Sequence, residues 1–350
     1  MKTLKELNLT DRRVLVRCDF NVPLDDGLEI LDDFRIQQAL STINYLINQK
    51  AKIILMSHLD PESTGVADRK YSLKIIAKKI SELLGVKIEM ANDCIGQEVE
   101  SQISEMNDGE ILMLENLRFY KEEISGDLEF AKKLSHLGEV YVGEAFSVCH
   151  RNHASVAVLP TLMENCAGIL LAKEIENLNK ILQNPEKPMT AIVGGKKVET
   201  KSKFIDRISE VADFVIVSGL IKKEIEDKKI VLKYPEKIIG PDGDLQALDI
   251  DQDSVNKFRE KILQSKTVLW NGPFGKFEDK NYLIGTRAIA DAIIESKAFS
   301  VVGGGETVEF LQKQGIVDRF SHVSTGGGAM LNYLAGDELP GISALEKNES

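Results

Sequence analysis

The sequence predicts an α/β protein with two domains, each built on a doubly wound parallel sheet. Short apolar segments alternate with helix-like segments through both halves of the chain, a pattern typical of parallel sheets covered on both faces. With 350 residues, 43% of them hydrophobic, the chain is long enough for two such cores. We expect a first domain over 1–168, a linking helix over 169–184 and a second domain over 185–335. The tail, 336–350, is expected to dock on the first domain.

In the first half, apolar runs predict strands at 14–17, 52–56, 111–114 and 140–142. Stretches with helical spacing of apolar residues lie between them, at 33–49, 72–84 and 127–137. The segment 167–184 also has apolar residues at helical spacing, and the Asn184-Pro185 pair ends it. We interpret it as the link between the domains.

In the second half, strands are expected at 190–193, 214–217, 267–270 and 299–302. Helix-like sequence follows two glycine runs, at 307–312 and 329–334. The same alternation of strand and helix therefore continues to the end of the chain.

Charge and composition narrow the class of protein. The net charge of −11 argues against a general nucleic-acid binder, so an anionic ligand must meet a local basic cluster. Four widely spaced cysteines, with no metal-ligand spacing, are expected to be reduced thiols. No signal peptide and no apolar run approaching 18 residues is seen, so we expect a cytoplasmic protein that does not bind membranes.

Two triple-glycine runs, Gly303–Gly305 and Gly326–Gly328, each follow a short strand-like segment and precede a helix-like one. A glycine turn that opens a helix directs bare backbone N–H groups and the positive end of the helix dipole at one point, which suits a phosphate. One run alone is a weak signal, because glycine also ends helices and closes turns. Two runs together predict a single anion cradle made from two helix starts.

Polar side chains follow the predicted strands of the first half, where ligands bind in a doubly wound sheet. They could together hold a small polyanion: Asp19, Asn21, Arg35, His58, Arg118 and Arg151. Guanidinium groups bind phosphate or carboxylate through paired hydrogen bonds. A single arginine is more often a solvated surface charge, but cationic and polar groups at successive strand ends favour a binding site.

Blocks of sequence along nearly the whole chain resemble the phosphoglycerate kinase family. They are VLVRCDFNVP (14–23), MSHL (56–59), LENLRF (114–119), HRNHAS (150–155), WNGPFGKFE (270–278), VGGGET (302–307) and STGGGA (324–329). The resemblance implies two Rossmann-like domains with a hinge that closes the cleft between them. It implies a monomeric enzyme of glycolysis that transfers a phosphoryl group reversibly between 1,3-bisphosphoglycerate and ADP, with Mg²⁺, giving 3-phosphoglycerate and ATP.

The resemblance also implies roles for single residues. The phosphoglycerate site would comprise Asp19, Asn21, Arg35, His58, Arg118 and Arg151. The nucleotide site would comprise Lys201, Asn271, Pro273, Glu278, Gly303, Gly304, Gly305, Glu306 and Thr307, with Glu306 also on the metal. The residues implied in transfer itself are Arg35, Lys197, Gly304 and Gly327.

Several positions depart from the family pattern. Asp60-Pro61 stands where the family has Gly-Arg, so one phosphate-binding arginine is missing, and Arg69 or Lys70 could replace it. After Val217 a glycine-rich loop and a long insertion that wall the adenine are absent, and Asp251 replaces a glycine. The sequence therefore leaves three alternatives: a working kinase with a trimmed base pocket, a weak or inactive relative that only binds these ligands, or an enzyme with another phosphoryl donor or acceptor.

Overall fold

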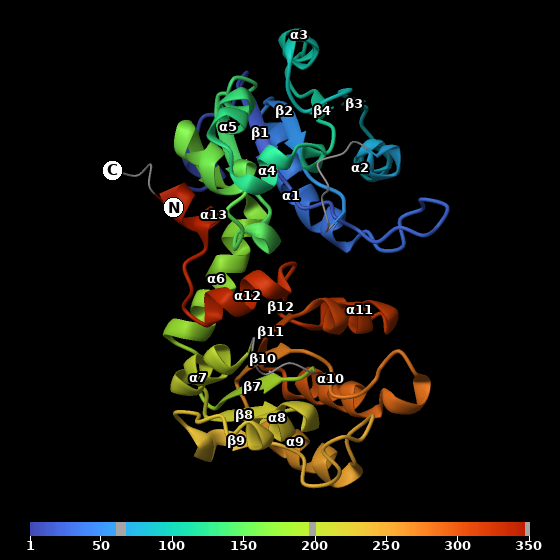
Figure 1. The fold of residues 1–350 in the computed structure, drawn as a ribbon, viewed down its shortest axis with the longest axis vertical. Coiled ribbons are helices and arrows are strands. Elements are labelled where there is room, and N and C mark those ends of the chain that lie inside the picture. The colour runs from blue at the N-terminus through green and yellow to red at the C-terminus, as the bar shows by residue number, and fades with distance from the viewer. Residues whose placement is uncertain (61–67, 196–200, 347–350) are drawn as a thin grey trace. The chain divides into compact units, whose positions relative to one another are not determined.

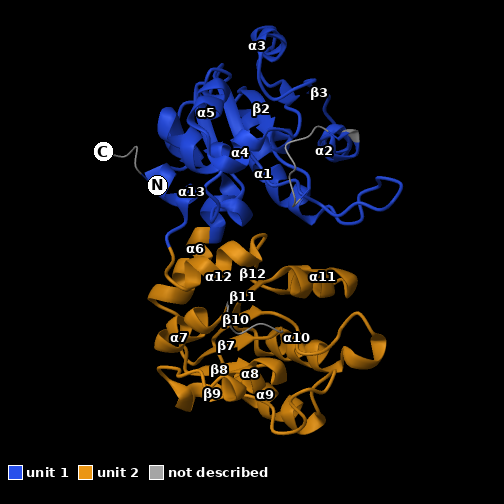
Figure 2. Cartoon of the chain, viewed as in Figure 1, with its two compact units in different colours: residues 1–174, 338–350 blue, residues 175–337 orange. Residues whose placement is uncertain are grey.

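The structure is a computed structural model that describes residues 1–60, 68–195 and 201–346. These residues form two compact units (Figure 2). The first contains 1–174 and the C-terminal segment from 338, and the second contains 175–337. The division falls inside helix α6 (Ile169–Gln183).

The first unit is built on a six-stranded sheet with the order β3-β4-β2-β1-β5-β6, in which all paired strands are parallel. The strands are β1 (Arg13–Arg17), β2 (Lys52–Met56), β3 (Ile88–Met90), β4 (Ile111–Met113), β5 (Val140–Gly143) and β6 (Glu164–Ala167). In this register Arg17 lies beside Met56 on one side and Gly143 on the other, so three strands end together.

Helices accompany this sheet (Figure 1): α1 (Phe34–Asn48), α2 (Lys74–Leu84), α3 (Gln97–Ser104), α4 (Lys121–Ser125), α5 (Leu128–Ser135) and α13 (Pro340–Glu346). The core forms where α1 presents Ile36, Ile43 and Leu46 to the buried strand residues Val14 and Val16. The C-terminal helix α13 buries Ile342 and Leu345, and the Gly341 amide donates to the Cys149 carbonyl at 2.9 Å.

The second unit has its own six-stranded sheet with the order β12-β11-β10-β7-β8-β9, again with parallel pairs. Its strands are β7 (Met189–Val193), β8 (Phe214–Val217), β9 (Ile238–Ile239), β10 (Thr267–Asn271), β11 (Phe299–Gly303) and β12 (His322–Val323). Every residue of β7 and β10 is buried, which requires cover on both faces of the sheet. Its helices are α7 (Ser202–Val211), α8 (Gly219–Asp227), α9 (Gln252–Gln264), α10 (Ile284–Ser296), α11 (Gly305–Lys313) and α12 (Gly327–Leu334).

The predicted fold class is confirmed: two parallel-sheet α/β units of six strands each. The strands that the sequence did not predict are β3, β6 and β9, each of two to four residues. All three are edge strands, whose few residues carry little of the pattern. Among the described residues, no helix is both long and apolar enough to cross a membrane.

Candidate active site

In the first unit, the polar residues gather where the strand order reverses. β1 is the first strand in the chain and lies inside the sheet, between β2 and β5. The loops after these strands therefore leave in different directions. Such a switch point is where doubly wound sheets bind ligands. The loop after β1 carries Asp19 and Asn21, the loop after β2 carries His58, and the loop after β5 carries Ser147.

Asp19 holds the centre of this cluster. Arg35, in the first turn of α1, donates from Nη1 to Asp19 Oδ2 at 2.8 Å and to the Asn21 carbonyl at 3.0 Å. The Ser147 hydroxyl and the Asn21 amide also donate to Asp19. Burial favours the neutral acid, but the Arg35 guanidinium and these two hydrogen bonds lower the pKa of Asp19 to about 2. The carboxylate is therefore ionised and fixes Arg35.

His58 is 2% exposed, and its Nε2 lies 3.9 Å from Asp19 Oδ1. Burial lowers the pKa of His58 well below its usual value; Asp19 opposes this shift, while Arg17, Arg118 and Arg35 reinforce it. His58 is thus a neutral side chain in a cationic pocket.

Arg118 is hydrogen-bonded to Asp60, one of the positions that depart from the family pattern. It follows β4 in a short 3₁₀ turn, Leu117–Phe119, and its Nη1 donates to the Asp60 carbonyl. The Asp60 amide donates to Asn21 Oδ1 at 2.9 Å, so the backbone of Asp60 is hydrogen-bonded both to the loop after β1 and to the turn after β4. Asp60 has φ 92°, a conformation that favours glycine, at the position where the sequence resemblance leads us to expect glycine.

The remaining predicted residues of this site are less enclosed. Arg151 is exposed in the loop after β5, and its charge acts on His150 and His153. Lys70 lies 3.5 Å from Asp68 and over the ring of Tyr71, so it already has partners near its own turn. The side chain of Arg69 and residues 61–67 lie outside the described residues.

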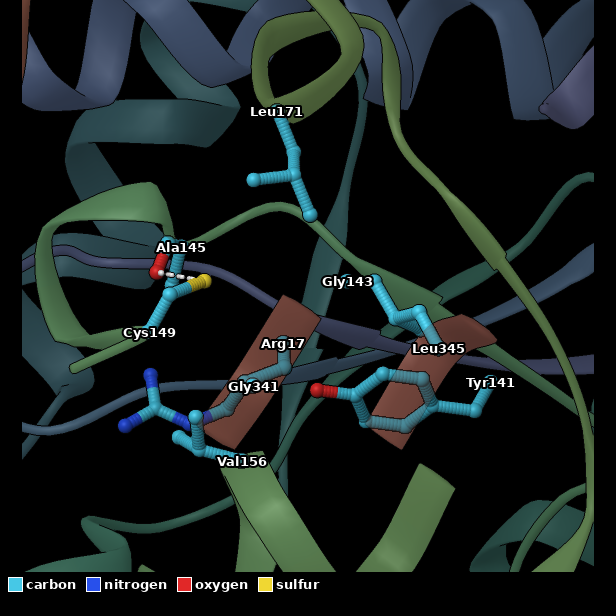
Figure 3. Close-up of a pocket in the computed structure, with 9 residues that line it drawn as sticks. All are labelled: Arg17, Tyr141, Gly143, Ala145, Cys149, Val156, Leu171, Gly341 and Leu345. Carbon is cyan, nitrogen blue, oxygen red and sulfur yellow. Dashed lines mark hydrogen bonds between the residues drawn. The ribbon is translucent and has the colours of Figure 1, made fainter. Parts of the chain in front are cut away.

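Sequence reasoning missed a buried layer beneath these side chains. Arg17, at the end of β1, is 1% exposed and lies against the fully buried carboxylate of Glu123. Ser155 accepts a hydrogen bond from Arg17 Nε at 2.7 Å and donates to Glu123. Arg17 also lines a small cavity, shown in Figure 3, together with Tyr141, Gly143, Ala145, Cys149, Val156, Leu171, Gly341 and Leu345. The one sequence signal was the charged residue Arg17 directly after three apolar residues of a strand.

In the second unit, the switch point lies between β7 and β10. Asn271, at the end of β10, is level with Val193 of β7 and with Gly303 of β11. The loops after these strands touch: a β-carbon on Gly194 would lie 2.2 Å from the Gly272 carbonyl oxygen. The Gly195 amide donates to the Pro273 carbonyl at 3.0 Å. Glycine is needed here because the two backbones cross without room for a side chain.

The two glycine runs form one feature. β11 and β12 are neighbours, so the turns after them open α11 and α12 at the same edge of the sheet. A β-carbon on Gly327 would lie 2.7 Å from Gly304 Cα, whereas one on Gly305 would meet nothing within 4 Å. The first turn of α11 thus leaves open space beside its bare amides, as an anion cradle requires.

Asn271 faces this cradle. It is 3% exposed, and its Nδ2 has no hydrogen-bond partner among the described residues. That nitrogen lies 3.1 Å from where a β-carbon of Gly304 would stand. Thr307 braces the turn by accepting from the Gly272 amide at 2.9 Å. A buried amide donor without a partner calls for an acceptor, and a phosphate oxygen supplies one.

Lys201 brings a cation to the same region. Its Nζ donates to the Gly194 carbonyl and lies 2.9 Å from where a β-carbon of Gly195 would stand. Burial lowers the pKa of Lys201 to about 8, and Glu306 opposes that shift. Glu306 is exposed in the first turn of α11. Lys197 lies outside the described residues.

The residues expected on the nucleoside side of the nucleotide site differ from each other in exposure. Pro273 is buried, while Glu278 is exposed. Asp251 caps α9, accepting from the Ser254 amide at 2.8 Å. Asp249 accepts from the Gly285 amide at 3.1 Å. Both carboxylates are thus engaged by backbone amides.

The model of the phosphoglycerate kinase family matches residues 4–227 and 221–337. These two segments meet in α8, next to the deletion that the sequence predicts after Val217. Phosphoglycerate kinase from Desulfosudis oleivorans is 41% identical over 395 residues, covering 100% of both chains. Phosphoglycerate kinase from Dictyoglomus turgidum is also 41% identical, covering 98% of both.

Comparison with solved structures points to the same family. Phosphoglycerate kinase from Pyrococcus horikoshii superimposes with a TM-score of 0.87 at 31% identity, covering 99% of this chain and 98% of that one. The enzyme from Coxiella burnetii gives a TM-score of 0.85 at 31% identity, with 99% of both chains covered. With matches in sequence and structure over nearly its whole length, this chain belongs to the phosphoglycerate kinase family.

Proposed function

We propose that this kinase transfers a phosphoryl group from 1,3-bisphosphoglycerate to ADP, reversibly, giving 3-phosphoglycerate and ATP. In this proposal the cationic pocket of the first unit binds the glycerate, and the glycine cradle of the second unit binds the nucleotide phosphates. The observation that carries it is the pair of facing glycine turns, Gly304 against Gly327, beside the unpartnered amide of Asn271.

In the first unit, Arg35, His58 and Arg118 would bind the glycerate, with Arg151 adding charge at the rim. Asp19 supports this assignment because its ionised carboxylate fixes Arg35 at 2.8 Å. A preorganised guanidinium loses little freedom when the anion arrives.

In the second unit, the amides of Gly303, Gly304 and Gly305 would meet the phosphates, with Asn271 Nδ2 and Lys201 Nζ as side-chain donors. Lys197 would meet the transferring group, while Pro273 and Glu278 would lie on the nucleoside side. The bare N-terminal turn of α11 supports this assignment.

The residues also fit Mg²⁺. This ion is usually held by one or two carboxylates and by substrate phosphates, not by a cage of protein ligands. Glu306 is an exposed carboxylate at the cradle, and the described residues contain no cluster of three or more His, Cys, Asp or Glu that could form a cage. When bound, Mg²⁺ would neutralise phosphate charge.

The chemical step needs little from the protein beyond alignment and charge. A β-phosphate oxygen of ADP attacks the acyl phosphorus, the new P–O bond forms, and the bond to the C1 carboxyl oxygen breaks. The electron pair of that bond leaves with the carboxylate of 3-phosphoglycerate, and no proton moves. Arg35 and the cradle amides would compensate the charge on the moving group.

A coupled assay that follows ATP formation from 1,3-bisphosphoglycerate and ADP tests the proposal. We expect ATP formation that depends on both substrates and on Mg²⁺, and loss of most of this activity in Arg35→Ala. Binding of both ligands without turnover would instead identify the chain as a binding protein.

A further inference from the structure

Arg17 is a buried cation that the transfer chemistry described above does not use. Its side chain is 1% exposed, and the Glu123 carboxylate beside it is 0% exposed. Its three nitrogens all have partners. Nε donates to Ser155 Oγ at 2.7 Å, Nη1 donates to the Cys18 carbonyl, and Nη2 lies 3.8 Å from Glu123 Oε1 and 3.3 Å from His58 Nδ1. The guanidinium is therefore held in one orientation.

Glu123 and Ser155 complete this support. Glu123 Oε2 accepts from the Ser155 amide at 2.9 Å, and Oε1 accepts from the Ser155 hydroxyl. Because that hydroxyl gives its hydrogen to Glu123, its oxygen is left to accept from Arg17. The Tyr141 hydroxyl donates to the Ser155 carbonyl at 3.0 Å and fixes the backbone of the same residue. Buried ionic groups satisfied in this way are costly to disturb, since removing one leaves the other unpaired.

The contact between Arg17 and His58 determines the state of the imidazole. A guanidinium has only donors and stays protonated, so Nη2 can meet His58 Nδ1 favourably only if that nitrogen is an acceptor. The single hydrogen of the neutral ring must then be on Nε2, which faces Asp19 at 3.9 Å. We propose that Arg17, held by Glu123 and Ser155, is a positioning residue that fixes His58 as the neutral tautomer with its hydrogen on Nε2.

The surrounding charges agree with a neutral ring. Arg17 from β1, Arg35 from α1 and Arg118 from the turn after β4 all disfavour a proton on His58, and Asp19 favours one. His58 then offers one N–H donor and no charge. This inference rests on the proposed function in one respect: if His58 contacts phosphoglycerate, it selects a ligand oxygen that accepts a hydrogen bond.

Long-range ¹H–¹⁵N spectra of the histidine rings in the full-length protein test the proposal directly. The chain has five histidines. The spectrum of His58→Gln lacks the signals of His58 and so identifies them in the wild-type spectrum. We expect His58 to show a pyridine-type Nδ1 and a pyrrole-type Nε2, unchanged from about pH 8 down to about pH 5, below the ordinary pKa of histidine. A hydrogen on Nδ1, or a ring that protonates near pH 6.5, would overturn the proposal.

A variant separates positioning from general charge. Arg17→Met with Glu123→Gln removes both buried charges, so neither is left unpaired. We expect mixed tautomers at His58 and a raised pKa, because the cation beside Nδ1 is gone. Arg13→Met, on the same strand but in an exposed pair with Glu139 at 3.3 Å, is the matched control and should leave His58 unchanged. An unchanged His58 in the double variant would also refute the role of Arg17; if that variant does not fold, the wild-type spectra still decide.

Adding 3-phosphoglycerate to the wild-type sample separates this inference from the proposed function. If His58 has its hydrogen on Nε2 but its signals do not respond to saturating 3-phosphoglycerate, the assignment of the binding site fails while the tautomer stands. If the signals respond but the hydrogen is on Nδ1, the site stands and the positioning role of Arg17 fails.

Discussion

Gly304 and Gly327 pack backbone against backbone: a β-carbon on Gly327 would lie 2.7 Å from Gly304 Cα and 3.0 Å from its nitrogen. Real β-carbons do not approach other atoms so closely, so this contact requires glycine. It places the first turns of α11 and α12 side by side. The cradle is therefore a product of two strand ends, and neither glycine run forms it alone.

Gly305 separates the binding role of the cradle from its structural role. Because no atom lies within 4 Å of its missing β-carbon, Gly305→Ala should leave stability unchanged or slightly raised, since alanine favours a helix by about 1 kcal/mol. The added methyl group would occupy the space proposed for a phosphate, so the Kd for MgADP should rise about tenfold, or about 1.4 kcal/mol. Calorimetric titration and thermal unfolding measure the two effects.

The control for that experiment is Gly327→Ala. Here the methyl group meets backbone, and overpacking of this kind costs about 1–3 kcal/mol, so both stability and MgADP affinity should fall. Unchanged MgADP affinity in Gly305→Ala would show that the nucleotide does not lie against this turn.

Lys201 should make nucleotide affinity depend on pH. Burial lowers the pKa of Lys201 to about 8 from its ordinary value of 10.5. As pH rises through about 8 the side chain loses the charge that we propose meets phosphate, so MgADP binding should weaken between pH 7 and pH 9. Lys201→Arg keeps its charge over this range and should show a much flatter profile. Equal slopes in the two proteins would remove Lys201 from the site.

The same shift affects stability with the opposite sign. Between about pH 8 and the ordinary pKa of lysine, the unfolded chain binds more protons at Lys201 than the folded chain does. The free energy of unfolding should therefore gain a contribution from this residue that increases with pH in that window. Urea unfolding of the wild type and of Lys201→Arg measures the difference.

The features that the sequence predicts are those made by residues close together in the chain. Contacts between residues far apart in the chain were not predicted. The strand, glycine turn and helix pattern predicts each half of the cradle, because it is local. The contact of Gly304 with Gly327 follows only once β11 and β12 are neighbours. Arg17 looked like the end of a strand, and nothing local connects it to Glu123 or Ser155. The short edge strand β9 was not predicted because two residues carry no periodicity.

Asp60 is predicted to store strain. Its φ of 92° lies outside the regions that residues with a side chain prefer, and such strain costs about 1–3 kcal/mol. Asp60→Gly relieves it but gives back about 0.5–1 kcal/mol as unfolded-state entropy, so we expect a net gain of about 1 kcal/mol in urea unfolding. Asp60→Asn removes the charge and keeps the β-carbon. If the asparagine variant is as stable as the glycine variant, charge and not strain is the cause.

Arg35 should act chiefly in the transition state. If it meets the moving phosphoryl group, Arg35→Ala should lower kcat about 100-fold or more, the effect of losing one preorganised donor. Arg35→Lys keeps the charge but not the fork that bonds Asp19 and the Asn21 carbonyl, so an intermediate kcat is expected. A normal kcat with only a raised KM for the glycerate would place Arg35 in ground-state binding.

The central claim is that the chain has separate sites for the glycerate and for the nucleotide. Crossed calorimetric titrations of 3-phosphoglycerate and MgADP against Arg118→Met, Gly305→Ala and the wild type test it most directly. The account predicts that Arg118→Met weakens 3-phosphoglycerate binding about tenfold or more and leaves MgADP within about twofold, and that Gly305→Ala does the reverse. If either substitution weakened both ligands equally, or neither had an effect, the two-site account would be contradicted.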